Sequence, residues 1–118
     1  MSQDALKHVY AFSYAESAKT FLILLAKGIE QLMNRGWDQQ ISIKDSIEWI
    51  YELFGDEIRR AAHISDKNYL KNASEQLDES KEHFQREEID DALLKITKAI
   101  SSATTQASRA LEAIERVV

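Results

Sequence analysis

The near-absence of residues that break helices constrains this chain more than any other feature. Its 118 residues include no proline and only three glycines, at positions 28, 36 and 55. Proline removes a helix hydrogen bond, and glycine inside a helix costs about 1 kcal/mol relative to alanine. Alanine, glutamate, lysine and leucine are used heavily instead. The composition therefore predicts an all-α fold with long helices.

The spacing of apolar residues predicts four helices in a single domain that spans residues 1–118. The first contains the longest apolar run and ends at Gly36, with a core face of Tyr10, Tyr14, Phe21, Leu25 and Leu32. The second carries the stripe Ile43, Ile47, Ile50, Tyr51, Phe54 and Ile58. The third buries Tyr69, Ala73, Leu77 and Phe84, and the fourth carries Ile89, Leu93, Ile96, Ile100, Ala103, Ala107, Leu111, Ile114 and Val118.

Short connections between these helices favour a simple topology. A shift in apolar phase between Phe84 and Ile89, followed by two aspartates, predicts a tight reversal over residues 85–88. Small residues in the middle of the first and last helices predict that these two helices pack closely. The simplest arrangement is an antiparallel up-down four-helix bundle.

One corner of the chain is similar to a known repeat. Phe84 before the turn, with Ala92 and Ala99 after it, resembles the inter-helix turn of a tetratricopeptide repeat. No second copy occurs at the expected period of about 34 residues. The resemblance therefore implies a helical hairpin and carries no function.

Charge and cysteine content exclude several classes of function. The net charge is −5 and the basic residues are scattered, which argues against nucleic-acid binding. Because the chain has no cysteine, it has no disulfide, thiolate metal site or cysteine nucleophile. The run Phe21 to Ala26 is too short to cross a membrane, and the amino terminus lacks a signal pattern. We expect a cytoplasmic protein with no membrane partner.

The sequence nominates no catalytic, cofactor-binding or metal-binding residue. None of His8, His63 and His83 has a glutamate three residues before it, so the Glu-x-x-His pattern of carboxylate-bridged di-metal bundles is missing. The glycines are isolated and form no phosphate-binding loop. We expect no cofactor.

The alternative to a non-enzymatic protein is a magnesium-dependent nucleotide pyrophosphohydrolase. The pairs Asp45-x-x-Glu48 and Glu75-x-x-Asp78 resemble the paired carboxylates with which the all-α NTP pyrophosphohydrolases hold magnesium. The family pattern begins with two glutamates, however. Asp45, Glu75 and Asp78 also lie about 120–180° from the apolar stripes of their helices.

A second family supplies a weaker comparison. Arg59 and His63 resemble the arginine and histidine of the HEPN group of four-helix RNases. They lie closer together than that catalytic motif requires, and they fall in the second helix instead of the last. The motif is therefore missing.

Apolar residues outside the core stripes point to an interaction surface. Trp49 and Leu53 lie opposite the stripe of the second helix, and Phe12 and Ile23 lie away from the core face of the first. Exposed apolar patches mark interaction sites, and tryptophan is a frequent anchor. We predict a self-associating module, most simply a dimer, or one that binds another protein. A small-ligand pocket among Tyr10, Tyr14 and Tyr51 is a third hypothesis.

Overall fold

The predicted apolar stripes form four α-helices in the computed structural model, which describes residues 3–35, 41–64 and 68–117. The helices are α1 (Gln3–Arg35), α2 (Ile41–Ile64), α3 (Asn68–Gln85) and α4 (Ile89–Val117). The described residues contain no strand, so the all-α prediction is confirmed for them. The expected helix stop at Gly36 and the side chain of Tyr69 lie outside the described residues.

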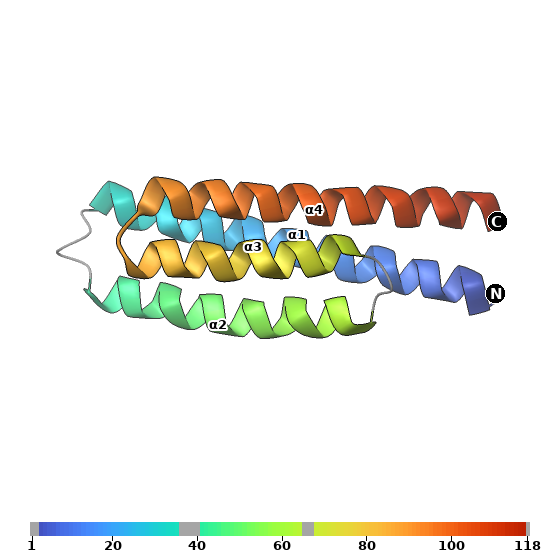
Figure 1. The fold of residues 1–118 in the computed structure, drawn as a ribbon, viewed down its shortest axis with the longest axis horizontal. Coiled ribbons are helices and arrows are strands. Elements are labelled where there is room, and N and C mark those ends of the chain that lie inside the picture. The colour runs from blue at the N-terminus through green and yellow to red at the C-terminus, as the bar shows by residue number, and fades with distance from the viewer. Residues whose placement is uncertain (1–2, 36–40, 65–67, 118) are drawn as a thin grey trace.

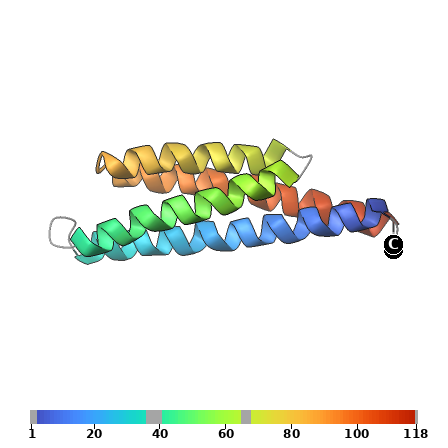
Figure 2. The same cartoon turned by 90° about the horizontal axis from the view of Figure 1, so that it is seen from below.

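The helices pack as an elongated bundle with extents of 54 × 19 × 17 Å (Figure 1). α1 contacts α2 and α4, and α3 likewise contacts α2 and α4. The two ends of the chain lie at the same end of the bundle (Figure 1). At that end, α1 and α4 extend beyond α2 and α3 (Figures 1 and 2).

The core takes residues from all four helices. Most of the predicted core-stripe members of α2, α3 and α4 are buried or pack against the core, whereas Leu111 of α4 is exposed. The stripe of α1 was wrong at one position, because Tyr10 is 52% exposed. Tyr10 lies near the end of α1 that projects past α2, where α4 is the only described helix beside it. The largest buried side chains are Tyr51, Phe84, Leu22, Leu25, Ile29, Leu32, Ile58, Leu70, Leu77 and Ile96.

Small side chains allow α1 and α4 to pack against each other, as predicted. Ala15 and Ala18 of α1 and Ala103 and Ala107 of α4 are all buried in the same core cluster. Alanine carries only a methyl group, so facing alanines let two helix backbones approach closely. These buried alanines are part of the contact between the two longest helices.

The predicted reversal between α3 and α4 is a Schellman turn. The N–H of Glu88 donates to the carbonyl of His83 (2.9 Å), and the N–H of Glu87 donates to that of Phe84 (3.0 Å). Glu87 has a positive φ of 62°, the left-handed conformation that glycine adopts without strain. The Glu88 carbonyl then accepts the first hydrogen bond of α4, from the N–H of Ala92 (3.0 Å).

The left-handed residue leads to a stability prediction. Glu87→Gly should be more stable than Glu87→Ala by about 1 kcal/mol, since only the alanine keeps a Cβ in a left-handed conformation. Both changes remove the exposed ion pair of Glu87 with Lys44 (3.4 Å), so the comparison isolates the backbone effect. Urea denaturation measures the difference. Equal midpoints for the two variants would contradict a strained Glu87.

Candidate functional site

Trp49, on the outer face of α2, is the most exposed large apolar residue in the described part of the chain. Trp49 is 63% exposed, and Leu53, one turn along the same helix, is 42% exposed. Both residues were predicted from the sequence to lie opposite the core stripe, and their exposure confirms that part of the prediction. An exposed tryptophan beside an exposed leucine is a surface that association with another apolar surface would stabilise.

The two interface candidates on α1 lie in a different environment. Phe12 and Ile23 are half-buried, and Phe12 packs against the hydrophobic core. They therefore offer only part of their side chains to a partner. α1 instead exposes Leu24, which is about half accessible and was not identified from the sequence.

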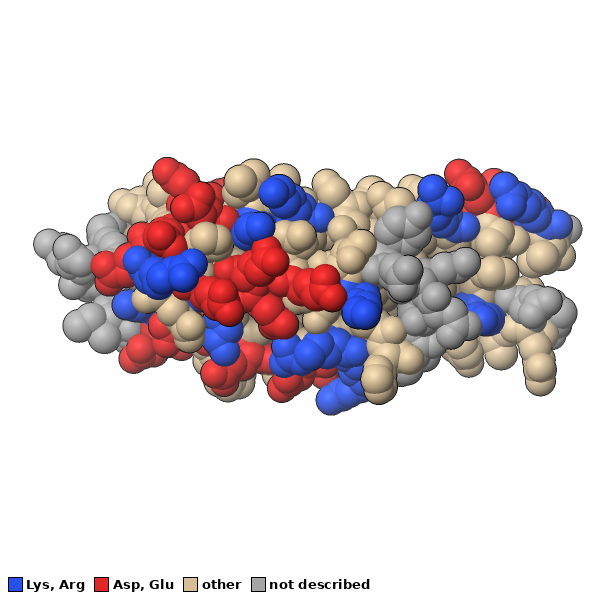
Figure 3. All heavy atoms as spheres, in the orientation of Figure 1, with Lys and Arg blue, Asp and Glu red and all other residues tan. Residues whose placement is uncertain are grey.

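The carboxylates of the alternative enzyme hypothesis lie on the outer faces of α2 and α3. Asp45, Glu75 and Asp78 are exposed and Glu48 is half-buried. Asp78 accepts a hydrogen bond from Arg59 (3.1 Å), which also pairs with Asp56. Figure 3 shows acidic atoms gathered over the middle of the bundle, with basic atoms beside them. This is the pattern of a solvated, ion-paired face.

A hollow of about 780 Å³ lies between the end of α2 and the start of α3. Of the four carboxylates in the magnesium hypothesis, only Glu75 lines it. The other lining residues with ionisable side chains are Arg59, Arg60, His63 and Lys71. Arg59 and Arg60 are already ion-paired with acidic residues of their own helix. The described lining residues therefore do not supply the set of oxygen ligands that magnesium requires.

The three tyrosines of the ligand hypothesis do not converge on one cavity. Tyr51 is buried, and its hydroxyl lies 2.7 Å from Ser80 Oγ in the core. Tyr14 lines a separate hollow of about 330 Å³ together with Phe21 and Arg60. Tyr10 is exposed. No shared tyrosine pocket exists among these described residues.

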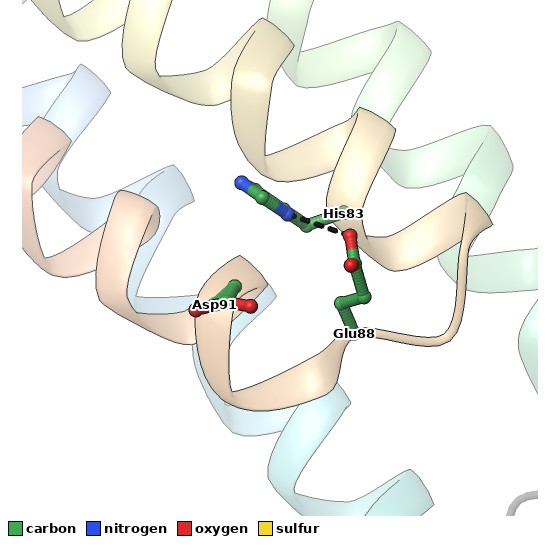
Figure 4. A group of neighbouring side chains, drawn as sticks. All are labelled: His83, Glu88 and Asp91. Carbon is green, nitrogen blue, oxygen red and sulfur yellow. Dashed lines mark hydrogen bonds and ion pairs between the residues drawn. The ribbon is translucent and has the colours of Figure 1, made fainter.

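A histidine and two carboxylates meet at the α3–α4 turn (Figure 4). His83 projects from the last turn of α3, Glu88 from the turn itself and Asp91 from the first turn of α4. Their ligand atoms lie within 4.8 Å of one another, a set that divalent metals use in proteins. Sequence reasoning missed this group because it searched for helical Glu-x-x-His spacing, whereas a turn brings these residues together.

The contacts within the turn favour an ion-paired cap over a metal site. His83 Nδ1 lies 2.9 Å from Glu88 Oε1, and Arg86 Nε donates to the same oxygen at 2.8 Å. These two hydrogen bonds, that of His83 first, lower the pKa of the Glu88 carboxyl. The guanidinium of Arg86 thus already supplies the positive charge that a metal ion would bring. We interpret the cluster as a set of hydrogen bonds that stabilises the α3–α4 turn.

A third hollow, of about 370 Å³, lies between α1 and α4 where they project beyond α2 and α3. His8, Arg109 and Glu112 are among its lining residues. Gln106 also lines it and is almost fully buried, and its Oε1 atom has no hydrogen-bond partner among the residues that the structure describes. Because this oxygen is buried, the hollow does not present it to a ligand.

Comparison with known proteins adds no candidate. No protein-family model matches the sequence, and neither a curated protein nor a solved structure matches it. Within the described ranges, none of the helices combines the length and apolarity needed to cross a lipid bilayer.

Proposed function

We propose that this protein is a non-enzymatic interaction module that associates with a second copy of itself, most simply as a two-fold dimer. The observation that carries the proposal is the exposure of Trp49 beside Leu53 on the outer face of α2. In a two-fold interface, the same patch occurs on both subunits, so two indole rings would be removed from water together. Tryptophan is among the residues that contribute most to binding energy at interfaces. The cytoplasmic location expected from the sequence is part of this proposal.

We also infer that the bundle is antiparallel and up-down. The tight turn between α3 and α4 and the contacts of each helix with its chain neighbours support this topology. Phe21 of α1 stacks on Phe54 of α2, with ring centroids 4.8 Å apart. In an antiparallel pair, this contact brings Leu24, one turn after Phe21, level with the turn of α2 that carries Trp49 and Leu53.

The proposed contact surface, called the α2 surface below, therefore consists of Trp49, Leu53 and Leu24. Charged residues border it, since Glu52 pairs with Lys81 of α3 (3.3 Å). An apolar centre with a charged rim is the usual composition of a protein interface. Phe12 and Ile23, the other two interface candidates from the sequence, lie outside this surface and would add only the exposed parts of their half-buried side chains to an interface.

Substitution of the anchors tests the proposal. Trp49→Ala and Leu53→Asp should each raise the dissociation constant of the dimer by about tenfold or more, because each removes an apolar contact at the centre of the patch. Sedimentation equilibrium measures this change. The matched control is Leu94→Asp, which places the same charge at a similarly exposed leucine on α4.

Two outcomes decide the matter. If the dissociation constant of the dimer rises in the Trp49 and Leu53 variants and not in the Leu94 variant, the result supports association through the α2 surface. A wild-type protein that stays monomeric up to millimolar concentration overturns self-association as the function.

No observation favours the enzyme as a second candidate. The carboxylates of the magnesium hypothesis lie on outer faces, and Asp78 is neutralised by Arg59 at 3.1 Å. Magnesium sites in enzymes use converging carboxylates that also orient a phosphate. We therefore do not propose a nucleotide hydrolase.

A further inference from the structure

The two longest helices leave one end of the molecule only two helices thick. α1 and α4 continue past the ends of α2 and α3 (Figure 2). Ser80 of α3 donates to the carbonyl of Ala92 in α4 (2.7 Å). With the antiparallel arrangement inferred above, Asn68, the first residue of α3, then lies level with about residue 104 of α4. We call residues 3–10 of α1 and 105–117 of α4 the α1–α4 extension.

The core stripe of α4 continues into this extension, beyond the end of α3. Ile96, Ala103 and Ala110 follow one another at intervals of seven residues on one face, and all three are buried. Val117, the next member at that interval, is half exposed. Apolar residues at this seven-residue spacing therefore continue along α4 beyond the end of α3.

Exposed apolar side chains are concentrated on the extension. Of the nine large apolar residues that are exposed in the described part of the chain, four lie on it. They come from both helices and include Tyr10 at 52% and Leu111 at 43%; the set is Leu6, Tyr10, Leu111 and Val117. Two helices without a further layer cannot cover such residues, so the end of the bundle is left with an incomplete core.

We propose that the α1–α4 extension packs against the same extension of a second copy, related by a two-fold axis. Two helices from each copy would then complete a four-helix cross-section, with the partner's pair beyond the ends of α2 and α3. The inference rests on the proposed self-association, to which it adds a second surface at the end of the bundle.

The charges of the extension fit a copy of itself better than a partner of one charge sign. Its sequence carries Lys7, Arg109 and Arg116 together with Asp4, Glu112 and Glu115. A surface with both signs becomes self-complementary when a two-fold axis places basic residues beside acidic ones. A polyanion such as nucleic acid would require a basic excess instead.

The size of the surface sets the expected affinity. The eight residues of α1 and the thirteen residues of α4 are about 12 Å and about 20 Å long, and two helices packed about 8–10 Å apart present a face about 20 Å wide. The contact would cover roughly 300 Å² per copy, below the roughly 800 Å² per partner of a standard interface. The end contact is therefore weak and depends on protein concentration.

Two separate two-fold surfaces on one chain have a consequence for the assembly. If each copy binds one neighbour through the α2 surface and another through its extension, dimers join into short rows or close into a tetramer. The wild-type protein should therefore exceed the mass of a dimer at high concentration. Removal of either surface should leave a dimer.

The test uses the full chain and a control on the same helix. Leu111→Lys and Tyr10→Lys should reduce the assembly to the dimer held by the α2 surface, measured by sedimentation velocity from micromolar to millimolar concentration. Leu94→Lys, at a leucine of similar exposure on α4 outside the extension, should leave the mass distribution unchanged. Far-ultraviolet circular dichroism verifies that each variant keeps its helix content.

The outcomes separate the two proposals. A wild-type mass that persists in the Leu111 and Tyr10 variants overturns the end contact and leaves the α2 surface intact. An assembly that Leu53→Asp does not change, but that Leu111→Lys reduces to monomers, supports the end contact and overturns the α2 surface. A wild-type monomer at every concentration overturns both.

Discussion

Phe84→Ala should lower the free energy of unfolding by about 3–5 kcal/mol, the cost of truncating a buried phenylalanine. Phe84 is completely buried in the last turn of α3, and its ring centroid lies 5.4 Å from that of Tyr51 on α2. The substitution loses the transfer free energy of the ring and leaves a cavity that the three helices meeting there fill only in part. A domain of this size has a total stability of about 5–15 kcal/mol, so this one change removes a large part of it.

Urea denaturation followed by circular dichroism measures this effect. Phe84→Leu serves as a partial truncation and should cost clearly less, since leucine fills part of the cavity. Leu94→Ala, at an exposed position of α4, should change stability by less than about 0.5 kcal/mol. A loss below about 1 kcal/mol in Phe84→Ala would show that the ring does not hold α2, α3 and α4 together.

The apolar periodicity was sufficient to predict most of the fold. Ile47, Tyr51 and Ile58 repeat at helical spacing in the sequence and are buried together on α2. The same rule failed at Tyr10, because periodicity identifies a face and does not reveal whether another helix is long enough to cover it. The length of α2 and α3 relative to α1 decides this, and it depends on where two connections fall.

The candidate surfaces could be predicted only in part, for a related reason. Trp49 and Leu53 lie opposite a clear stripe, so their exposure follows from one helix alone. Leu24 was missed as a member of the proposed α2 surface, because its position depends on which side of α1 faces α2. The stacking of Phe21 on Phe54 shows that side only in the folded structure. Glu87 was missed as a left-handed residue because the position that usually carries glycine carries glutamate here.

The sequence also could not predict a network of buried hydrogen bonds in the core, which joins Tyr51, Ser80 and Ala92. Ser80 Oγ lies 2.7 Å from both the Tyr51 hydroxyl and the carbonyl oxygen of Ala92. A serine hydroxyl has one proton, and the carbonyl can only accept it, so Ser80 donates to Ala92. The Tyr51 hydroxyl must therefore donate to Ser80. This chain of two hydrogen bonds links α2, α3 and α4 in the core.

Because Tyr51 is buried in this network, the free energy of unfolding above about pH 10 should depend on its ionisation. Burial raises the pKa of the Tyr51 hydroxyl above its ordinary value, because the phenolate would lose its hydration in the core. A tyrosine whose pKa is higher in the folded state contributes its full stability below the unfolded pKa of about 10 and loses it as the pH rises above that value. Compared with the wild type, Tyr51→Phe should therefore lose less stability above about pH 10.

The direction of the hydrogen bonds predicts unequal costs for the two partners at neutral pH. Ser80→Ala should lower the free energy of unfolding by about 1–3 kcal/mol, because it leaves the buried Tyr51 hydroxyl without an acceptor. Tyr51→Phe should cost only about 0.5–1.5 kcal/mol, since Ser80 keeps its bond to Ala92.

The double variant tests whether the two side chains are coupled. Once Tyr51 is phenylalanine, Ser80→Ala no longer leaves a buried donor without an acceptor, so the double variant should lose less stability than the sum of the single variants. Urea denaturation of the four proteins measures this coupling. Strictly additive costs, or a Tyr51→Phe variant that loses more than Ser80→Ala, would mean that Ser80 does not accept the tyrosine proton.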